Sequence, residues 1–298
     1  MPPGSTDVGA YATAILTRGA SSRSVVRLLD VTESIEPANV GRLAPVAEGP
    51  RVHGCEPLAR PTRRHVLGVP CDMRIVGWNT RQGGGHTKYE HLGELSPDIA
   101  VLPEYGDLPC GPPPGVTDGR FLDFGTAGAR GVGVVAAPAW TISTADVLPI
   151  SGEVIGAVEA RGDLEVNVIA VWACLSSRPA VNPVVEAAAA WADWVHKRPT
   201  VVIGDFNTGF HWTDAKGSGA HSPIVDALAA LGLRQVCCSS ADQDGPTTHW
   251  HGGTKKSFHI DHVFVSSDLA VAGWGVGLHH PWASLSDHAP IVVDAAPR

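Results

Sequence analysis

The sequence has few charged side chains and no long apolar segment. Charged residues make up 17% of its 298 residues, below the roughly 25% that is usual for soluble proteins. No apolar run approaches the ~20 residues that a membrane-spanning helix requires. The N-terminus also lacks the basic start and the apolar stretch of a secretion signal. We therefore expect a soluble, cytoplasmic protein that makes no contact with a membrane.

Cysteine pairs and a basic excess are missing too. The six cysteines form no CxxC pair and have no regular spacing, which argues against a disulfide framework and a thiolate zinc site and fits a reducing compartment. The formal net charge is −8, so the chain lacks the cationic surplus that tight, sequence-independent nucleic-acid binding uses. Hydrophobic residues at 44% are nevertheless enough for a folded core.

The hydrophobic pattern of the sequence changes near residue 72. Residues 1–72 show no sustained period of a helix or strand, whereas short β-branched runs separated by turns begin at Met73. Residues 73–298 hold 14 basic and 23 acidic side chains, a net charge of −9. We expect a poorly ordered N-terminal extension over 1–72, outside the native product if translation starts at Met73, and one catalytic domain over 73–298.

Apolar patterning within 73–298 predicts alternating strands and helices. The predicted strands cover Arg74–Trp78, Asp98–Pro103, Gly131–Ala137, Glu165–Ala173, Thr200–Gly204, Ile260–Ser266 and Ala289–Asp294. The predicted helices cover His86–Leu95, Val184–His196 and Pro223–Leu231. Continuous apolar strands are typical of sheets covered on both faces, so the pattern indicates a layered α/β sandwich.

Polar side chains stand at the ends of these apolar strands. The set comprises Asn79, Glu104, Asp205, Asn207, Asp261, Asp287 and His288. The first four follow a strand and the last three begin one, so all would meet on one rim if the last two strands run antiparallel to the others. A single such residue is usually a turn former. A carboxylate-rich cluster that spans five sites instead indicates a bound cation or shared protons.

The same residues carry a resemblance to a known family. Five segments can be compared, in order, with known motifs: WN at 78–79, DIAVLPE at 98–104, GDFN at 204–207, IDHVFVS at 260–266 and SDHAPIVV at 286–293. They resemble the motifs of the endonuclease/exonuclease/phosphatase superfamily of DNase I-like and apurinic-endonuclease-like enzymes. The resemblance spans nearly all of 73–298. It implies a four-layered α/β sandwich, with two packed mixed sheets flanked by helices, that cleaves phosphate esters with Mg²⁺ or Mn²⁺.

The resemblance also implies a role for each residue. Glu104 matches the main metal-binding carboxylate, with Asn79 and Asp287 beside it, and Asp205 matches the group that orients or deprotonates water. Asn207 would hold a phosphate oxygen, while Asp261 would orient and charge the imidazole of His288 at the scissile phosphate. These residue types suit the chemistry, because Mg²⁺ prefers few hard oxygen ligands and an imidazolium neutralises phosphate charge.

One stretch departs from the family pattern. Many members place a His or Tyr at the end of a middle strand, before a Leu, where it touches the phosphate. Ala173 or Cys174 occupies that place here, which separates this chain from those members.

Several further residues admit two interpretations. His249 and His251 share one face of a strand and form either a transition-metal pair or part of the active-site rim next to Lys255 and Lys256. Trp212 and Trp250 either stack on bases or pack internally. Gly83–Gly85 is either a phosphate-binding turn or a flexible loop. Trp191, Trp194 and His262 are expected in the interior.

Three functions remain open at this point. The first is a metal-dependent phosphodiesterase that acts on nucleic acid by in-line attack of water. The second is a phosphatase or phosphodiesterase for a small or lipid phosphate. The third is a non-catalytic binding protein, which would have no need of the complete set of metal and proton-transfer residues. No sequence feature indicates an obligate protein partner.

Overall fold

The computed structural model describes residues 72–81, 85–107, 109–147, 150, 154–173, 182–210, 221–236, 246–252 and 256–298. The predicted extension over 1–72 lies outside this part of the chain except for Asp72, as do Cys174, Trp212, Lys255 and Gly83–Gly84. Within it, no helix is both long and apolar enough to cross a membrane.

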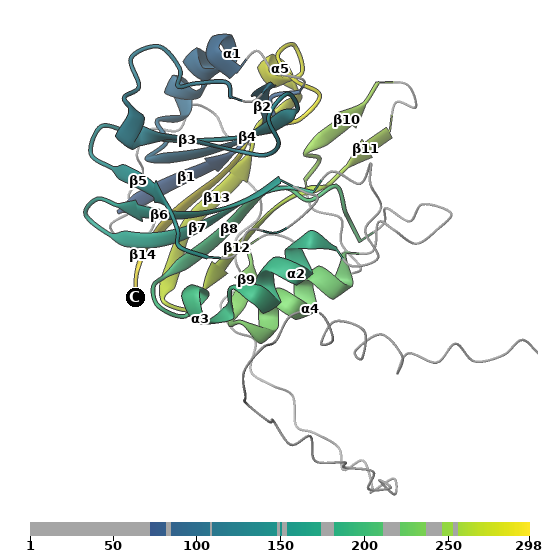
Figure 1. The fold of residues 1–298 in the computed structure, drawn as a ribbon. Coiled ribbons are helices and arrows are strands. Elements are labelled where there is room, and N and C mark those ends of the chain that lie inside the picture. Colours follow the sequence, from purple (N-terminus) through teal and green to yellow (C-terminus); the bar gives the residue numbers. More distant parts are fainter. Residues whose placement is uncertain are drawn as a thin grey trace, which may run out of the picture. The chain divides into compact units, whose positions relative to one another are not determined.

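Two six-stranded sheets form the centre of the described part of the chain (Figure 1). The first sheet contains, in spatial order, β13 (Leu269–Val276), β14 (Ile291–Pro297), β1 (Met73–Gly77), β2 (Ile99–Asp107), β4 (Arg130–Ala136) and β3 (Phe121–Phe124). The second contains β5 (Thr141–Thr144), β6 (Val154–Arg161), β7 (Glu165–Trp172), β8 (Thr200–Asp205), β12 (Asp261–Ser266) and β9 (Leu233–Gln235). A separate hairpin pairs β10 (His249–His251) with β11 (Lys256–Phe258).

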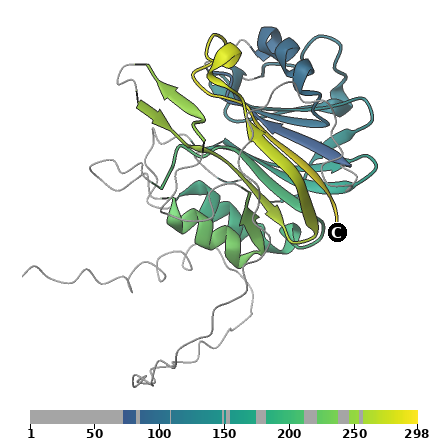
Figure 2. The ribbon, with the colours of Figure 1, turned by 180° about the vertical axis from the view of Figure 1, so that it is seen from behind.

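Helices cover the outer faces of both sheets. The first sheet carries α1 (Gly85–Leu92), the 3₁₀ turns η2 (Gly93–Leu95) and η3 (Asp118–Arg120), and α5 (His279–Trp282); the second carries α2 (Pro183–Ala190), α3 (Ala192–Val195) and α4 (Ser222–Ala230). Figures 1 and 2 show these groups at opposite ends of the stack. One apolar cluster lies between the sheets and one beneath each helical layer. The predicted four-layered α/β sandwich is therefore confirmed.

Local chemistry explains where the elements deviate from the prediction. The helix predicted over Val184–His196 is broken at Trp191, whose backbone (φ −109°, ψ 14°) caps α2 before α3 begins. Both Trp191 and Trp194 are buried against the second sheet, as predicted. Capping of α2 follows the local sequence, because the Asn182 side chain accepts the Val184 N–H and Pro183 occupies the first turn.

Strand direction brings the polar ends together. β14 runs antiparallel to β1, and β12 runs antiparallel to β8, whereas β1 and β2 are parallel. The strands of the last two motifs thus run antiparallel to neighbouring strands of the earlier motifs, which is the condition for one shared rim. Gly204 allows β8 to approach β7, because a Cβ there would lie 2.0 Å from the Val171 carbonyl oxygen. Glycine is required at this position immediately before Asp205.

Candidate active site

Two residues of the rim have a left-handed backbone. Glu104 has a φ of 54° and lies within an irregularity of β2, where the pairing with β4 shifts between Pro103 and Asp107. Asn207 has a φ of 48°, a conformation that Asn tolerates better than most residues. Such backbone at a strand end redirects a side chain out of the sheet and is enriched at functional sites.

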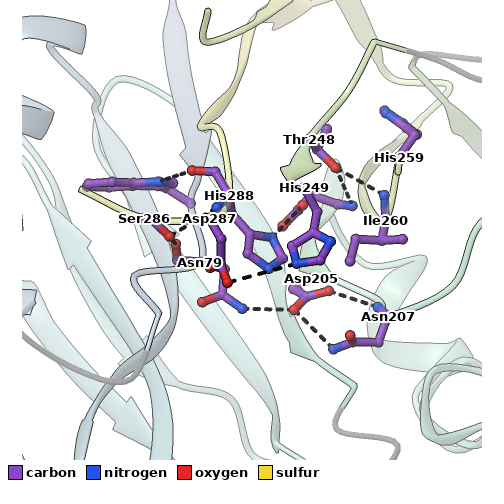
Figure 3. Close-up of polar contacts among 12 residues, drawn as sticks. Asn79, Asp205, Asn207, Thr248, His249, His259, Ile260, Ser286, Asp287 and His288 are labelled. Carbon is purple, nitrogen blue, oxygen red and sulfur yellow. Dashed lines mark hydrogen bonds and ion pairs between the residues drawn. The ribbon is translucent and has the colours of Figure 1, made fainter. Parts of the chain in front are cut away.

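A chain of hydrogen bonds links both sheets across the rim (Figure 3). The Asn79 amide nitrogen donates to Glu104 Oε1 at 3.2 Å and to Asp205 Oδ2 at 2.8 Å. Asp205 also accepts from Asn207 twice, at Oδ1 from the backbone N–H and at Oδ2 from the side-chain amide. Asn79 is completely buried, and its side-chain oxygen Oδ1 accepts from Arg81 N at 2.8 Å. Asn79 thus holds two carboxylates near one another.

The second part of the rim is an Asp–His pair. His288 Nδ1 lies 2.9 Å from Asp261 Oδ2, and both residues are buried. Thr248 fixes the start of β12, because its hydroxyl oxygen accepts the backbone N–H groups of Ile260 at 3.0 Å and Asp261 at 3.1 Å. Its carbonyl oxygen also accepts from Ala289 N. Thr248 therefore ties both members of the pair into one unit.

The loop that carries His288 is anchored on either side. Ser286 donates its hydroxyl to the Asn79 carbonyl at 2.8 Å and accepts from His288 N at 3.1 Å. Trp78 donates its indole N–H to the His288 carbonyl at 2.9 Å. The backbone of His288 is therefore positioned from the first sheet, whereas its ring is held by Asp261 from the second sheet.

Positive side chains surround the carboxylates at the edge of the site. Arg81 Nε lies 3.3 Å from Asp287 Oδ2, and Arg130 Nη1 lies 3.9 Å from Glu104 Oε2. Lys88 donates to the carbonyl oxygen of Thr80. Burial lowers the pKa of Lys88, with Arg81 adding to that effect and Asp287 and Glu104 opposing it. These groups offset part of the negative charge of Glu104 and Asp287.

Burial and neighbouring charges shift the pKa values of two central residues. Burial raises the pKa of Asp205 to about 7, although His288 and the hydrogen bonds from Asn207 and Asn79 oppose the rise. For His288, burial alone would lower the pKa, but Asp261, through its charge and hydrogen bond, raises it to about 9, with help from Asp205 and Asp287. An acid that titrates near neutrality thus lies beside a charged imidazole.

The donor set near Glu104 suits a hard cation. Glu104 keeps 19% of its side chain exposed, and Mg²⁺ is usually bound by one or two carboxylates together with waters and substrate phosphate. Two other groups of described residues bring three possible ligand atoms within 4.8 Å of one another: Asp205 with Asp261 and His288, and His249 with Asp287 and His288. The rim can therefore hold a metal ion in more than one place.

Most of the residues singled out by sequence come together. Asn79, Glu104, Asp205 and Asn207 form one hydrogen-bonded set, and Asp261 and His288 form the pair beside it. Asp287 lies at the edge, 4.0 Å from His249 Nε2. His262 is fully buried on the other face of β12, as expected. Ala173 donates its N–H to the Asp205 carbonyl, so this position supports β8 through its backbone.

Sequence reasoning missed three contributors. Thr248 and Ser286 act through hydroxyl contacts with backbone groups, and Arg130 reaches Glu104 from the neighbouring strand β4. Ser286 stands inside the SDH motif, which was a usable signal; Thr248 and Arg130 have none in the linear sequence. Trp250 is half-buried, with its ring 4.7 Å from that of His279.

Comparison with known proteins gives a family match over part of the chain. A family model described as endonuclease-reverse transcriptase matches residues 187–292, the segment that contains Asp205, Asn207, Asp261, Asp287 and His288. No curated protein matches the chain.

Solved structures share the fold at low sequence identity. A 3′ phosphatase from Neisseria bound to a product DNA hairpin is 17% identical, with a TM-score of 0.56 over 75% of this chain and 99% of its own. An AP endonuclease from Archaeoglobus fulgidus has the same identity and TM-score over 76% and 99%. The endonuclease domain of the telomere-specific retrotransposon TRAS1 is 17% identical, with a TM-score of 0.53 over 74% and 97%. These structures share the fold of this chain, and the family model supports the resemblance to the endonuclease/exonuclease/phosphatase superfamily over residues 187–292.

Proposed function

We propose that this chain is a Mg²⁺- or Mn²⁺-dependent phosphodiesterase that cleaves nucleic acid by in-line attack of water. One observation carries the proposal: the hydrogen-bonded set of Glu104, Asn79 and Asp205 lies directly beside the buried Asp261–His288 pair. This arrangement combines a partly exposed carboxylate for a cation, a base and a charged imidazole. Phosphoryl transfer requires these groups and little else from a protein.

Asp205 is the proposed general base. Its pKa of about 7 lets the carboxylate accept a proton near neutral pH. Asn207 and Asn79 fix both oxygens of Asp205 through donated hydrogen bonds, so the carboxylate is oriented before substrate arrives. The Asn207 side chain would then also be able to contact a phosphate oxygen beside the attacking water.

His288 is the proposed phosphate contact. Nδ1 of His288 is hydrogen-bonded to Asp261, so Nε2 is the nitrogen that remains for a phosphate oxygen. The ring is charged at neutral pH because its pKa is about 9. A fixed positive charge in a buried site stabilises the negative charge that builds on the phosphate oxygens in the transition state.

Glu104 is the proposed principal cation ligand, with Asn79 and Asp287 beside it. When bound, Mg²⁺ or Mn²⁺ would neutralise charge on the phosphate and help to align it. Arg130 approaches Glu104 at 3.9 Å and offsets part of its charge.

Nucleic acid is the proposed substrate, and the structural neighbours support it, since they include endonucleases and a phosphatase bound to DNA. The net charge of −9 over residues 73–298 favours a second candidate, a phosphatase or phosphodiesterase for a small or lipid phosphate. Arg81 and Lys88 could serve a short or single-stranded substrate in either case. We place this activity in the cytoplasm, with no obligate protein partner.

The experiment is a panel of DNA, RNA, abasic duplex, nucleotide and inositol phosphate substrates with Mg²⁺ or Mn²⁺. Glu104→Gln should weaken the cation dependence and lower kcat at least ~10²-fold, since it removes a ligand charge, while circular dichroism and thermal unfolding stay unchanged. Glu94→Gln, in an exposed position, is the matched control and should retain full activity. Equal hydrolysis in EDTA and in Mg²⁺ would contradict the metal assignment, and hydrolysis of the small phosphates alone would favour the second candidate.

A further inference from the structure

His249 lies in the site without a role in the proposed reaction. Its side chain is only 12% exposed, and its ring centroid lies 4.6 Å from that of His288. The Nδ1 atom is buried and has no hydrogen-bond partner among the described residues, whereas Nε2 faces Asp287 Oδ2 at 4.0 Å. Nε2 is therefore the ring nitrogen of His249 that faces another side chain of the site.

His249, Asp287 and His288 have the composition of a transition-metal site. One ligand atom from each lies within 4.8 Å of the other two. Three protein ligands of the His and carboxylate type, with a fourth position for water, are typical of Zn²⁺. Tetrahedral bonds of about 2.1 Å separate neighbouring ligand atoms by roughly 3.4 Å. The 4.0 Å between His249 Nε2 and Asp287 Oδ2 is close to that separation, and Asp287, with 29% of its side chain exposed, has room to move inward.

The surroundings of His288 support the same assignment. Asp261 accepts from Nδ1 at 2.9 Å, which orients Nε2 as the available nitrogen. A carboxylate behind a ligating histidine is the usual support for zinc, because it fixes the tautomer and makes the other nitrogen a better donor. Arg81 forms the competing ion pair with Asp287 at 3.3 Å, but its side chain is 56% exposed and can move into solvent.

We propose that His249, Asp287 and His288 bind Zn²⁺, and that this binding inhibits hydrolysis. Zn²⁺ takes the place of the proton on His288 Nε2, which is released to solvent, while Nδ1–H continues to donate to Asp261. The ring then no longer contacts the scissile phosphate. The binding site stands on its own geometry; the inhibition rests on the proposed function.

Binding is tested without any substrate. Metal-free protein is titrated with Co²⁺, which takes the same ligands and has visible absorption, and the bound Co²⁺ is then displaced with Zn²⁺. His249→Phe keeps a flat ring and should weaken the binding of both cations at least ~10²-fold. Even the loss of a residue that is hydrogen-bonded to a metal ligand weakens metal binding about 10–100-fold. His251→Phe, two residues along β10, is the control and should bind as the native chain does. Asp287→Asn provides a second variant with a small change of shape and should also weaken binding.

Equal Zn²⁺ affinity in the native chain, His249→Phe and Asp287→Asn would overturn the site. Loss of binding in His251→Phe would overturn it as well, because the metal would then belong to the His249–His251 pair. Inhibition is measured as the activity in Mg²⁺ with Zn²⁺ divided by the same variant's activity without Zn²⁺. This ratio should fall steeply for the native chain and stay near one for His249→Phe. Zn²⁺ binding in a chain that cleaves no phosphate ester would contradict the proposed function and leave the site intact.

Discussion

The histidines on the two sides of β12 have opposite pKa shifts. Asp261 and His262 are neighbours in sequence and both are buried, but they point to opposite sides of the strand. On the rim face, Asp261 raises the pKa of His288 to about 9 against the effect of burial. On the other face, burial lowers the pKa of His262 well below its usual value, with His221 and His259 adding to the shift.

The partners account for the difference. His262 Nε2 lies 2.8 Å from the Thr208 carbonyl oxygen, its Nδ1 lies 3.0 Å from Gln235 Nε2, and its ring stacks on His221 at 3.8 Å. These contacts satisfy a neutral ring that donates at Nε2 and accepts at Nδ1. No carboxylate is among them. The charge state of a buried histidine therefore depends on whether a carboxylate lies beside it, and the same strand lies next to both a charged Asp–His pair and a cluster of neutral histidines.

The largest effect is expected when the charged pair of Asp261 and His288 is removed. His288→Ala should lower kcat at least ~10²-fold with little change in KM, because the charge acts on the transition state. Asp261→Asn should cost a comparable factor, and the double variant should be little worse than either single variant, since the two residues act as one unit. Steady-state kinetics of all four proteins measures the coupling. Fully multiplicative losses would show that the pair is uncoupled.

A smaller effect is expected from Thr248, which holds the start of β12. Thr248→Val keeps the shape but leaves the N–H groups of Ile260 and Asp261 unpaired, which should lower the free energy of unfolding by about 1–3 kcal/mol. Displacement of Asp261 should also reduce kcat roughly tenfold, the scale of one hydrogen bond to a charged group. Thr248→Ser keeps the hydroxyl and should restore both kcat and stability. A Ser variant as impaired as Val would contradict the positioning role.

The buried neutral histidines, His221 and His262, should affect how the free energy of unfolding depends on pH. Burial, together with His259, lowers the pKa of His221 to about 4, so below the unfolded value of about 6.5 the unfolded chain binds protons that the native chain does not. Above about pH 6.5 this difference in proton binding is absent. At about pH 5.5 it should lower the free energy of unfolding by about 1 kcal/mol for each such histidine. Urea unfolding at several pH values measures the slope. His221→Phe should flatten it, whereas His196→Gln, an exposed position, should not.

The smallest effect is expected from the N-terminal extension. We propose that residues 73–298 fold and function without 1–72, because every rim and cluster contact described above lies within 73–298. A truncated chain that begins at Met73 should match the full chain in kcat, thermal unfolding and pH dependence. An unfolded or inactive truncated chain would place the boundary elsewhere.

The strands that carry the motifs were predictable because each is a short apolar run that ends at a polar residue. β3, β5, β6, β9, β13 and the β10–β11 hairpin were not predicted. β13 mixes Gly and Ala with its apolar residues, and the hairpin is only half-buried, so neither has the period of a buried strand. The break at Trp191 was hidden for another reason, since its sequence still has helical spacing and only packing decides the cap.

The members of the candidate site were predictable, but their contacts were not. Sequence placed Asn79 near Glu104 without showing that its amide would donate to Asp205 in the other sheet. Thr248 and Arg130 act through backbone groups or a neighbouring strand, and such contacts depend on register, which a single sequence does not contain.

The Asn79–Asp205 hydrogen bond joins residues that belong to different sheets. Neither sheet alone holds the whole set of rim residues, so the rim exists only when the two sheets are packed together. A loosely packed intermediate with both sheets formed but misaligned would retain its secondary structure and have no competent centre. The proposed hydrolytic activity would then serve as a direct probe of native packing.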